Sequence, residues 1–394
     1  MQEKVQNRKK YICLFLFCIC SFAMNLYSAQ LSPLAGQLMD KFRITRVQYT
    51  SLYMSTLLPS LLLGIPCAWA VKRFGIKKCQ CIGMGIGLAG LVLRLFFDEF
   101  SLFYLFTLLL GFANVVISTM GVATFTQGFK KESAGIVTGI MIAFGAGGKA
   151  LAELTTALFP VFWQMTVMDI LLQCTILAAW IFFMDDLEPV QTQTTVGQTF
   201  RQIMKDRYIW IGAVALMLVF GLYTGISAHL PSILSKKGYD TFQGGFITSF
   251  ISIGYFVGAV TLPKLTSLLR KKKNFMMLLA ATGSLFTVLA AVNTNKVILI
   301  LCVFIIGLCV GGLLPLSLAI PVSILQFDTQ KSQTAGSLLT TFQLAGAVLI
   351  PTYVIVPLAE NNANAILIYT AILMAVEGIL FYCLPKSKQQ REES

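Results

Sequence analysis

Residues 49–78 read YTSLYMSTLLPSLLLGIPCAWAVKRFGIKK. The apolar stretch 49–71 runs directly into a short segment that carries four basic residues. A helix needs about 20 apolar residues to cross a bilayer, so this stretch predicts a membrane-spanning helix with cations at one end. Similar stretches recur along the chain and predict twelve spans, at residues 11–32, 49–71, 79–97, 101–126, 135–158, 161–184, 209–233, 243–265, 274–292, 297–325, 333–358 and 365–384.

The composition agrees with a polytopic membrane protein. Of the 394 residues, 56% are hydrophobic and only 12% are charged, and the mean hydropathy is +0.77. A soluble globular chain carries about 25% charged residues. The net charge of +13 would favour nucleic-acid binding in a soluble protein. Here the cations lie in short loops between spans, so we exclude nucleic acid as a partner.

The basic residues are sorted by side. If the N-terminus is cytoplasmic, 22 of the 30 Lys and Arg residues fall in cytoplasmic segments and six fall in outer loops. Cytoplasmic loops carry an excess of Lys and Arg, so this bias predicts a multi-pass protein of the cell membrane with both termini cytoplasmic. Two cations remain, Arg94 and Lys149, and both fall inside predicted spans.

The chain divides near its middle. The longest cytoplasmic connection, residues 185–208, reads DDLEPVQTQTTVGQTFRQIMKDRY and is polar. It separates an N-terminal six-helix bundle, 1–184, from a C-terminal six-helix bundle, 209–394. The two halves also share a short similar sequence, because residues 25–28 (NLYS) late in span 1 resemble residues 221–224 (GLYT) in span 7. Related halves are typical of transporter folds, in which the substrate site lies where the repeats meet.

Six plus six spans and a long central loop resemble the major facilitator superfamily. The loop after span 2 carries the best local motif, in which Arg73, Gly75, Lys77 and Lys78 fit the family pattern and Lys72 occupies its acidic position. The resemblance implies an all-α fold of twelve transmembrane helices, alternating access and a gating role for this loop. Lys72 is a departure from the family, in which a carboxylate at this position helps to lock the inner gate. Within the family, the chain loosely resembles the small bacterial branch that includes cyanate and nitroimidazole transporters.

Span 5 contains a charged pair. Lys149 and Glu153 are four residues apart and share a helix face. If spans 5 and 6 are adjacent, Asp169 lies at the same depth, about 12–13 Å below the outer end of the spans by helix rise. A charge inside a bilayer costs roughly 2.5–3.5 kcal/mol, so such residues are usually functional. We expect Lys149 to bind an anionic substrate and Glu153 or Asp169 to accept a proton. The alternative is a buried pair that only holds two helices together.

Other residues are weaker candidates. Neutral polar side chains in spans that line the cavity of the family can contact substrate or only join helices. Arg94 lies near the end of span 3 and can extend to the outer surface. The substrate-binding candidates besides Lys149 are Asn25, Tyr27, Ser28, Gln30, Asn114, Tyr223, Thr224 and Gln343.

The sequence favours a secondary transporter over an enzyme. The chain holds one histidine, and its ten cysteines show no zinc-type spacing with it. We therefore expect no metal, no cofactor and no catalytic residue. The predicted function is proton-coupled transport, as a monomer, of a small organic molecule, in particular an organic anion. The alternative is a drug or metabolite exporter with a permissive apolar cavity, which the 30 Phe and 15 Met residues support.

Overall fold

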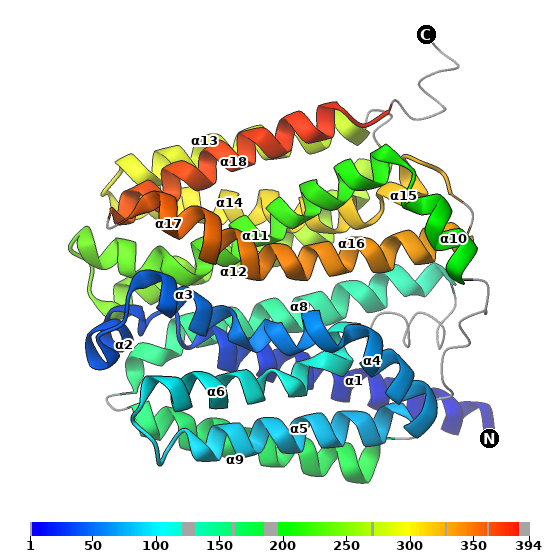
Figure 1. The fold of residues 1–394 in the computed structure, drawn as a ribbon, viewed down its shortest axis with the longest axis horizontal. Helices are drawn as coiled ribbons and strands as arrows, with labels where there is room; N and C mark the ends of the chain where they lie inside the picture. The colour runs from blue at the N-terminus through cyan, green and yellow to red at the C-terminus, as the bar shows by residue number, and fades with distance from the viewer. Residues whose placement is uncertain are drawn as a thin grey trace. The chain divides into compact units, whose positions relative to one another are not determined.

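The structure is a computed structural model, and it describes residues 2–119, 131–159, 162–184, 196–268, 272–327, 329–360 and 362–385. Every regular element within these ranges is a helix (Figure 1). The chain forms two compact units, Met1–Gln191 and Thr192–Ser394. The division falls inside the connection that the sequence predicts at 185–208, of which residues 185–195 lie outside the described ranges.

The first unit contains the first six spans. The second span combines α3, η1 and α4, and the fourth continues from α6 to Thr119. The elements are α1 (Gln2–Ala29), α2 (Ala35–Phe42), α3 (Arg46–Met54), the 3-10 turn η1 (Ser55–Leu57), α4 (Leu58–Phe74), α5 (Ile76–Leu93), α6 (Phe100–Leu110), α8 (Lys131–Thr155), η2 (Thr156–Leu158) and α9 (Phe162–Phe183).

The second unit contains the remaining six. Its eleventh-span helix is built from α16, the π-helix η3 and α17. The elements are α10 (Val196–Ile203), α11 (Arg207–Lys236), α12 (Thr241–Leu268), α13 (Lys272–Val292), α14 (Lys296–Leu318), α15 (Ile320–Ser323), α16 (Thr329–Leu349), η3 (Ile350–Ile355), α17 (Val356–Ala359) and α18 (Ala363–Tyr382).

The predicted spans are confirmed as helices. Eleven helices among the described residues are long and apolar enough to cross a membrane, and α8 covers the predicted span 135–158. Residues 120–126 of the predicted fourth span lie outside the described ranges. Two short helices were not predicted, α2 in the loop after span 1 and α10 in the central connection. In α10, Ile203 is buried in a cluster with Ile209 and Ala335 of its own unit.

The two units repeat one packing scheme. In the first, α1 packs on α8, η1 packs on α6 and α5 packs on α9. In the second, α11 packs on α16, α12 on α14 and α13 on α18. In span order these are pairs 1–5, 2–4 and 3–6, followed by 7–11, 8–10 and 9–12. The internal similarity seen at residues 25–28 and 221–224 therefore extends to the way each unit is assembled.

Glycines let the paired helices approach closely. A Cβ on Gly148 of α8 would overlap the carbonyl oxygen of Phe22 on α1, and one on Gly346 of α16 would overlap that of Met217 on α11. Helices α12 and α14 each place two glycines against the backbone of the other helix. These glycines are Gly254 and Gly258 on α12, and Gly307 and Gly311 on α14. Without a hydrophobic driving force inside lipid, such close backbone contact is a main source of helix association.

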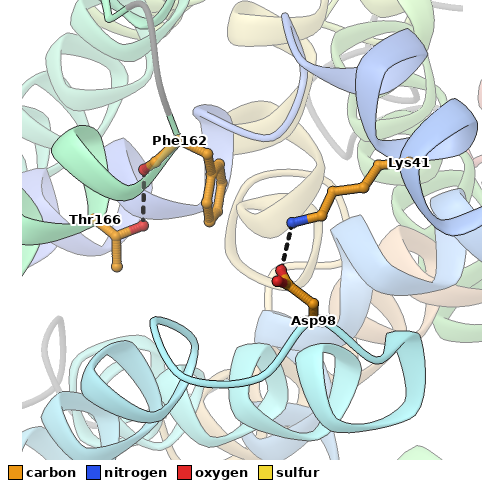
Figure 2. A network of polar contacts seen from close by, with 4 residues as sticks. All are labelled: Lys41, Asp98, Phe162 and Thr166. Atoms are coloured by element: carbon orange, nitrogen blue, oxygen red, sulfur yellow. Dashed lines mark hydrogen bonds and ion pairs between the residues drawn. The ribbon is translucent and has the colours of Figure 1, made fainter.

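Loop contacts close the first unit at the end where α1 terminates. Lys41 Nζ lies 2.6 Å from Asp98 Oδ1 and joins the last turn of α2 to the connection before α6 (Figure 2). Both side chains are largely exposed, so the pair contributes at most about 1 kcal/mol. In the first turn of α9, the Thr166 hydroxyl donates to the carbonyl oxygen of Phe162 over 3.2 Å (Figure 2). Asp169 follows one turn later.

Candidate functional site

Helix α8 carries two buried charges. Lys149 is 8% exposed and Glu153 is fully buried, and the two groups interact electrostatically. Glu153 also interacts electrostatically with the buried phenol of Tyr53 in α3. The Tyr53 hydroxyl has no hydrogen-bond partner among the described residues. The predicted association of Lys149 with an acidic partner is thus present, and the partner lies on its own helix.

Asp169 belongs to a different cluster. Its Oδ1 accepts a 2.9 Å hydrogen bond from Gln30 Nε2, and its backbone oxygen accepts a 3.2 Å bond from the Tyr27 hydroxyl. The cation whose charge acts on Asp169 is Arg94. The structure therefore brings together Tyr27, Gln30 and Asp169. The cation that interacts with Asp169 is Arg94, whereas equal depth in the membrane had suggested Lys149.

The reason is the order in which helices pack. Equal depth would make Asp169 a partner of Lys149 only if spans 5 and 6 were neighbours. In the structure α8 packs on α1, whereas α9 packs on α5 and α1. Asp169 consequently meets the end of α5, where Arg94 lies, and the residue that follows α1, which is Gln30.

Arg94 does not extend to the surface as the sequence suggested. It is only 6% exposed, and its guanidinium lies over two aromatic rings, 4.7 Å from the centroid of Phe103 and 5.0 Å from that of Phe162. Cation–π contacts of this kind stabilise a desolvated Arg by up to about 2 kcal/mol. Arg94 is held inward because these rings and the charge of Asp169 replace the water that it loses.

A small pocket lined by polar and apolar residues lies in the first unit. It has a volume of about 30 Å³, and eight residues of α1, η1, α6 and the continuation of α6 line it. Asn25 and Asn114, both predicted as substrate contacts, meet here. The lining residues are Met24, Asn25, Ser28, Thr56, Leu57, Leu110, Gly111 and Asn114.

The candidates of the second unit lie on paired helices. Tyr223 of α11 is buried and stacks on Tyr255, with ring centroids 4.7 Å apart. The Thr224 hydroxyl donates to the Phe220 carbonyl over 2.9 Å and faces the Ala347 carbonyl of α16 at 3.4 Å. Gln343 is half-buried on α16. The two residues of α11 thus have structural partners within their own unit.

The basic loop motif forms a tight turn between α4 and α5. Gly75 has a φ of +84°, a conformation that residues with a Cβ rarely adopt. Its amide donates to the Val71 carbonyl over 2.9 Å, which closes the end of α4. The Arg73 guanidinium lies 5.4 Å from the ring centroid of Trp69, while Lys78 is exposed and Lys77 half-buried. The motif is therefore a glycine turn with cations on its surface.

Three residues of these clusters were not predicted as site residues: Tyr53, Thr56 and Arg94. Arg94 had a signal in the sequence, since it is one of two cations inside a span. Tyr53 and Thr56 had none, because a single Tyr or Thr in an apolar helix is indistinguishable from a packing residue.

These features define a class of protein. Two helical bundles with one packing scheme, and buried charges within membrane-spanning helices, are typical of a transporter of small molecules. The chain belongs to the major facilitator superfamily, because the model of that family matches residues 13–351. The family assignment made from the loop motif and the six-plus-six pattern is thus confirmed.

Solved structures show the same fold. The nucleoside transporter NupG superposes with a TM-score of 0.76 at 16% identity, covering 94% of this chain and 99% of its own. A bacterial homologue of the human lysosomal transporter Spinster, inward-facing and unoccupied, superposes with a TM-score of 0.73 at 12% identity, covering 95% and 96%. An uncharacterised protein of Archaeoglobus fulgidus is 24% identical over 183 residues, which are 46% of this chain and 81% of that protein.

Proposed function

We propose that this protein is a proton-coupled secondary transporter of a small organic anion, working as a monomer by alternating access. The observation that carries the proposal is the pair Lys149 and Glu153, buried one helix turn apart in a membrane span. Each charge costs roughly 2.5–3.5 kcal/mol at such a position, so their retention favours a role in transport. Similarity to NupG supports transport of a small organic molecule. The positive charge of Lys149 favours an anionic substrate.

The pair suggests how the two species are coupled. Without substrate, Glu153 balances the charge of Lys149. An anion that binds Lys149 competes with Glu153 for that cation. A buried carboxylate without a cation is expensive, and it becomes neutral by taking up a proton. Anion binding and proton uptake therefore occur in the same step, which predicts symport. Asp169 is a second proton acceptor in this scheme, and the loop residues Arg73, Gly75, Lys77 and Lys78 serve the gate.

The test is uptake into proteoliposomes of a panel of labelled small carboxylates, with and without an imposed proton gradient. Lys149→Ala should keep folding and lose uptake by at least about tenfold, because a charge-assisted contact is removed. Lys296→Ala, which removes an exposed lysine at the start of α14, is the matched control. Wild-type uptake by Lys149→Ala would overturn the proposal, and selective inhibition by apolar cations would favour the exporter alternative.

We also propose that both termini face the cytoplasm of a cell-membrane protein. The 22-to-six distribution of cations supports this orientation. A reporter enzyme that is active only outside the cytoplasm should be active when fused after Thr294, in the connection between α13 and α14, and inactive when fused after Leu268, at the end of α12. The reverse pattern would invert the topology.

A further inference from the structure

The pocket of the first unit is lined by four uncharged polar residues and four apolar ones. Its four polar residues, Asn25, Ser28, Thr56 and Asn114, each bear a group that both donates and accepts hydrogen bonds. Its volume of about 30 Å³ exceeds the roughly 10–15 Å³ that a single water molecule needs. The pocket is therefore too small for a whole metabolite, and its four polar residues can hydrogen-bond one hydroxyl or amide group.

The walls of the pocket are held in place. The Asn25 amide donates from Nδ2 to the Ser21 carbonyl over 2.9 Å, which orients the side chain along α1. Thr56 Oγ1 lies 3.4 Å from Ser28 Oγ and links η1 to α1. On the third side, a Cβ on Gly111 would overlap the Thr56 carbonyl oxygen, so only glycine lets α6 approach η1 this closely. The polar groups are thus fixed before any ligand arrives, which lowers the entropy cost of binding.

The pocket is close to the charged pair along α8. Asn25 rests against Gly145, where an added Cβ would lie 3.1 Å from Asn25 Nδ2. Lys149 follows Gly145 by four residues, or about 6 Å along the helix axis. Side chains on a helix lean toward its N-terminus, so the Lys149 side chain leans toward the turn that contains Gly145. A cation and a neutral hydrogen-bonding pocket are therefore separated by about one helix turn.

We infer that this pocket is a subsite for a hydroxyl or amide group of the transported molecule. The inference rests on the proposed role of Lys149 and makes the substrate class narrower: a small carboxylate that also carries a hydroxyl or amide a few bonds away from its charge. The carboxylate is bound by Lys149, and the neutral polar group is hydrogen-bonded by Asn25, Ser28, Thr56 and Asn114.

The test uses pairs of acids that differ only by one hydroxyl. Propionate and lactate, butyrate and 3-hydroxybutyrate, and succinate and malate are compared as stabilisers of the full-length protein in detergent. We expect the hydroxylated member of at least one pair to bind about tenfold more tightly, the usual effect of one buried hydrogen bond. Asn114→Leu should reduce that preference to less than about twofold, while Asn364→Leu, on an exposed residue of α18, should retain it.

The outcomes separate the subsite from the anion site. Equal binding of both members of every pair would overturn the subsite and leave the anion proposal standing. A preference that survives in Asn114→Leu would also overturn it, because the hydroxyl would then bind elsewhere. Binding that is abolished by Asn114→Leu but unaffected by Lys149→Ala would overturn the proposed function instead. If Asn114→Leu does not fold, Ser28→Ala removes a second group of the same pocket and decides the question.

Discussion

Gln30 Nε2 donates a 2.9 Å hydrogen bond to Asp169 Oδ1 and thereby ties the chain just after α1 to the middle of α9. Tyr27, one turn earlier on α1, donates to the backbone oxygen of the same aspartate. The first span, which also contributes Asn25 to the polar pocket, is thus held at Asp169 by two hydrogen bonds. Arg94 supplies the opposite charge from the end of α5.

The first prediction concerns the partner of Asp169. Removing one member of a buried charge pair leaves the other uncompensated. Arg94→Gln and Asp169→Asn should each destabilise the protein, and the double variant should be more stable than the sum of the two losses predicts, by about 0.5–3 kcal/mol. The measurement is a double-mutant cycle of unfolding in detergent.

Lys149 provides the control for that cycle. Its electrostatic partner is Glu153 rather than Asp169, so Lys149→Met and Asp169→Asn should combine additively, within about 0.5 kcal/mol. The opposite result would be additive stability losses for Arg94→Gln and Asp169→Asn, with strong coupling between Lys149→Met and Asp169→Asn. It would show that Lys149 and Asp169 are partners, as equal depth in the membrane suggests.

The second prediction separates substrate binding from proton coupling. Glu153→Gln preserves the size of a fully buried side chain and removes its ability to ionise. If Glu153 carries the proton, the variant should lose accumulation of substrate driven by a proton gradient. It should retain exchange of labelled for unlabelled substrate across the membrane, because exchange requires no net proton movement. Gradient-driven accumulation at the wild-type level would assign the proton to Asp169 or to another group.

Much of the fold could be predicted from the sequence, because a bilayer leaves few alternatives. Backbone groups in lipid must be hydrogen-bonded internally, so an apolar stretch of sufficient length has to be a helix. The predicted spans 274–292 and 365–384 match α13 and α18 to within about two residues. Helix α10 was missed because it has only eight residues and lies within a polar connection, although Ile203 is buried against its own unit.

The candidate site was harder to predict, for a geometric reason. Depth in the membrane is predicted by counting residues, and Lys149, Glu153 and Asp169 are all buried within the protein. Which helices are neighbours does not follow from counting. Arg94 and Asp169 interact because α9 packs on α5. The spacing of residues within either helix does not predict this packing. The pocket residue Thr56 was missed for the same reason, since η1 brings it to α1 only in three dimensions.

The third prediction tests the close packing of α12 and α14. A Cβ on Gly311 would overlap the carbonyl oxygen of Tyr255, so Gly311→Ala should force the two helices apart and lower the melting temperature. Gly336 of α16 is the matched control, because a Cβ there meets nothing within 4 Å. Gly336→Ala should be neutral or stabilise the protein by up to about 1 kcal/mol, the difference in helix propensity. Equal effects of the two substitutions would contradict the interdigitated packing.

The fourth prediction concerns the connection after α11. Lys237 Nζ donates to the carbonyl oxygens of Ala290, Ala291 and Asn293 over 2.7, 2.8 and 2.7 Å. These groups lie at the end of α13, where carbonyls lack partners within the helix and a cation also balances the helix dipole. Burial lowers the pKa of Lys237 below the usual value for lysine. Part of the stabilisation that these hydrogen bonds provide therefore offsets the hydration that the ammonium group loses.

Lys237→Met should therefore destabilise the second unit by about 1–2 kcal/mol, which is less than three independent charged hydrogen bonds would give. The neighbouring Lys236 is exposed, and Lys236→Met should change stability by less than about 0.5 kcal/mol. Thermal unfolding of both variants in one detergent gives the comparison. Because the hydrogen bonds of Lys237 go to the end of α13 and to no proposed substrate contact, its loss should leave the affinity for carboxylates unchanged in the folded fraction. A Lys237→Met protein as stable as Lys236→Met would show that water replaces the three hydrogen bonds at no cost.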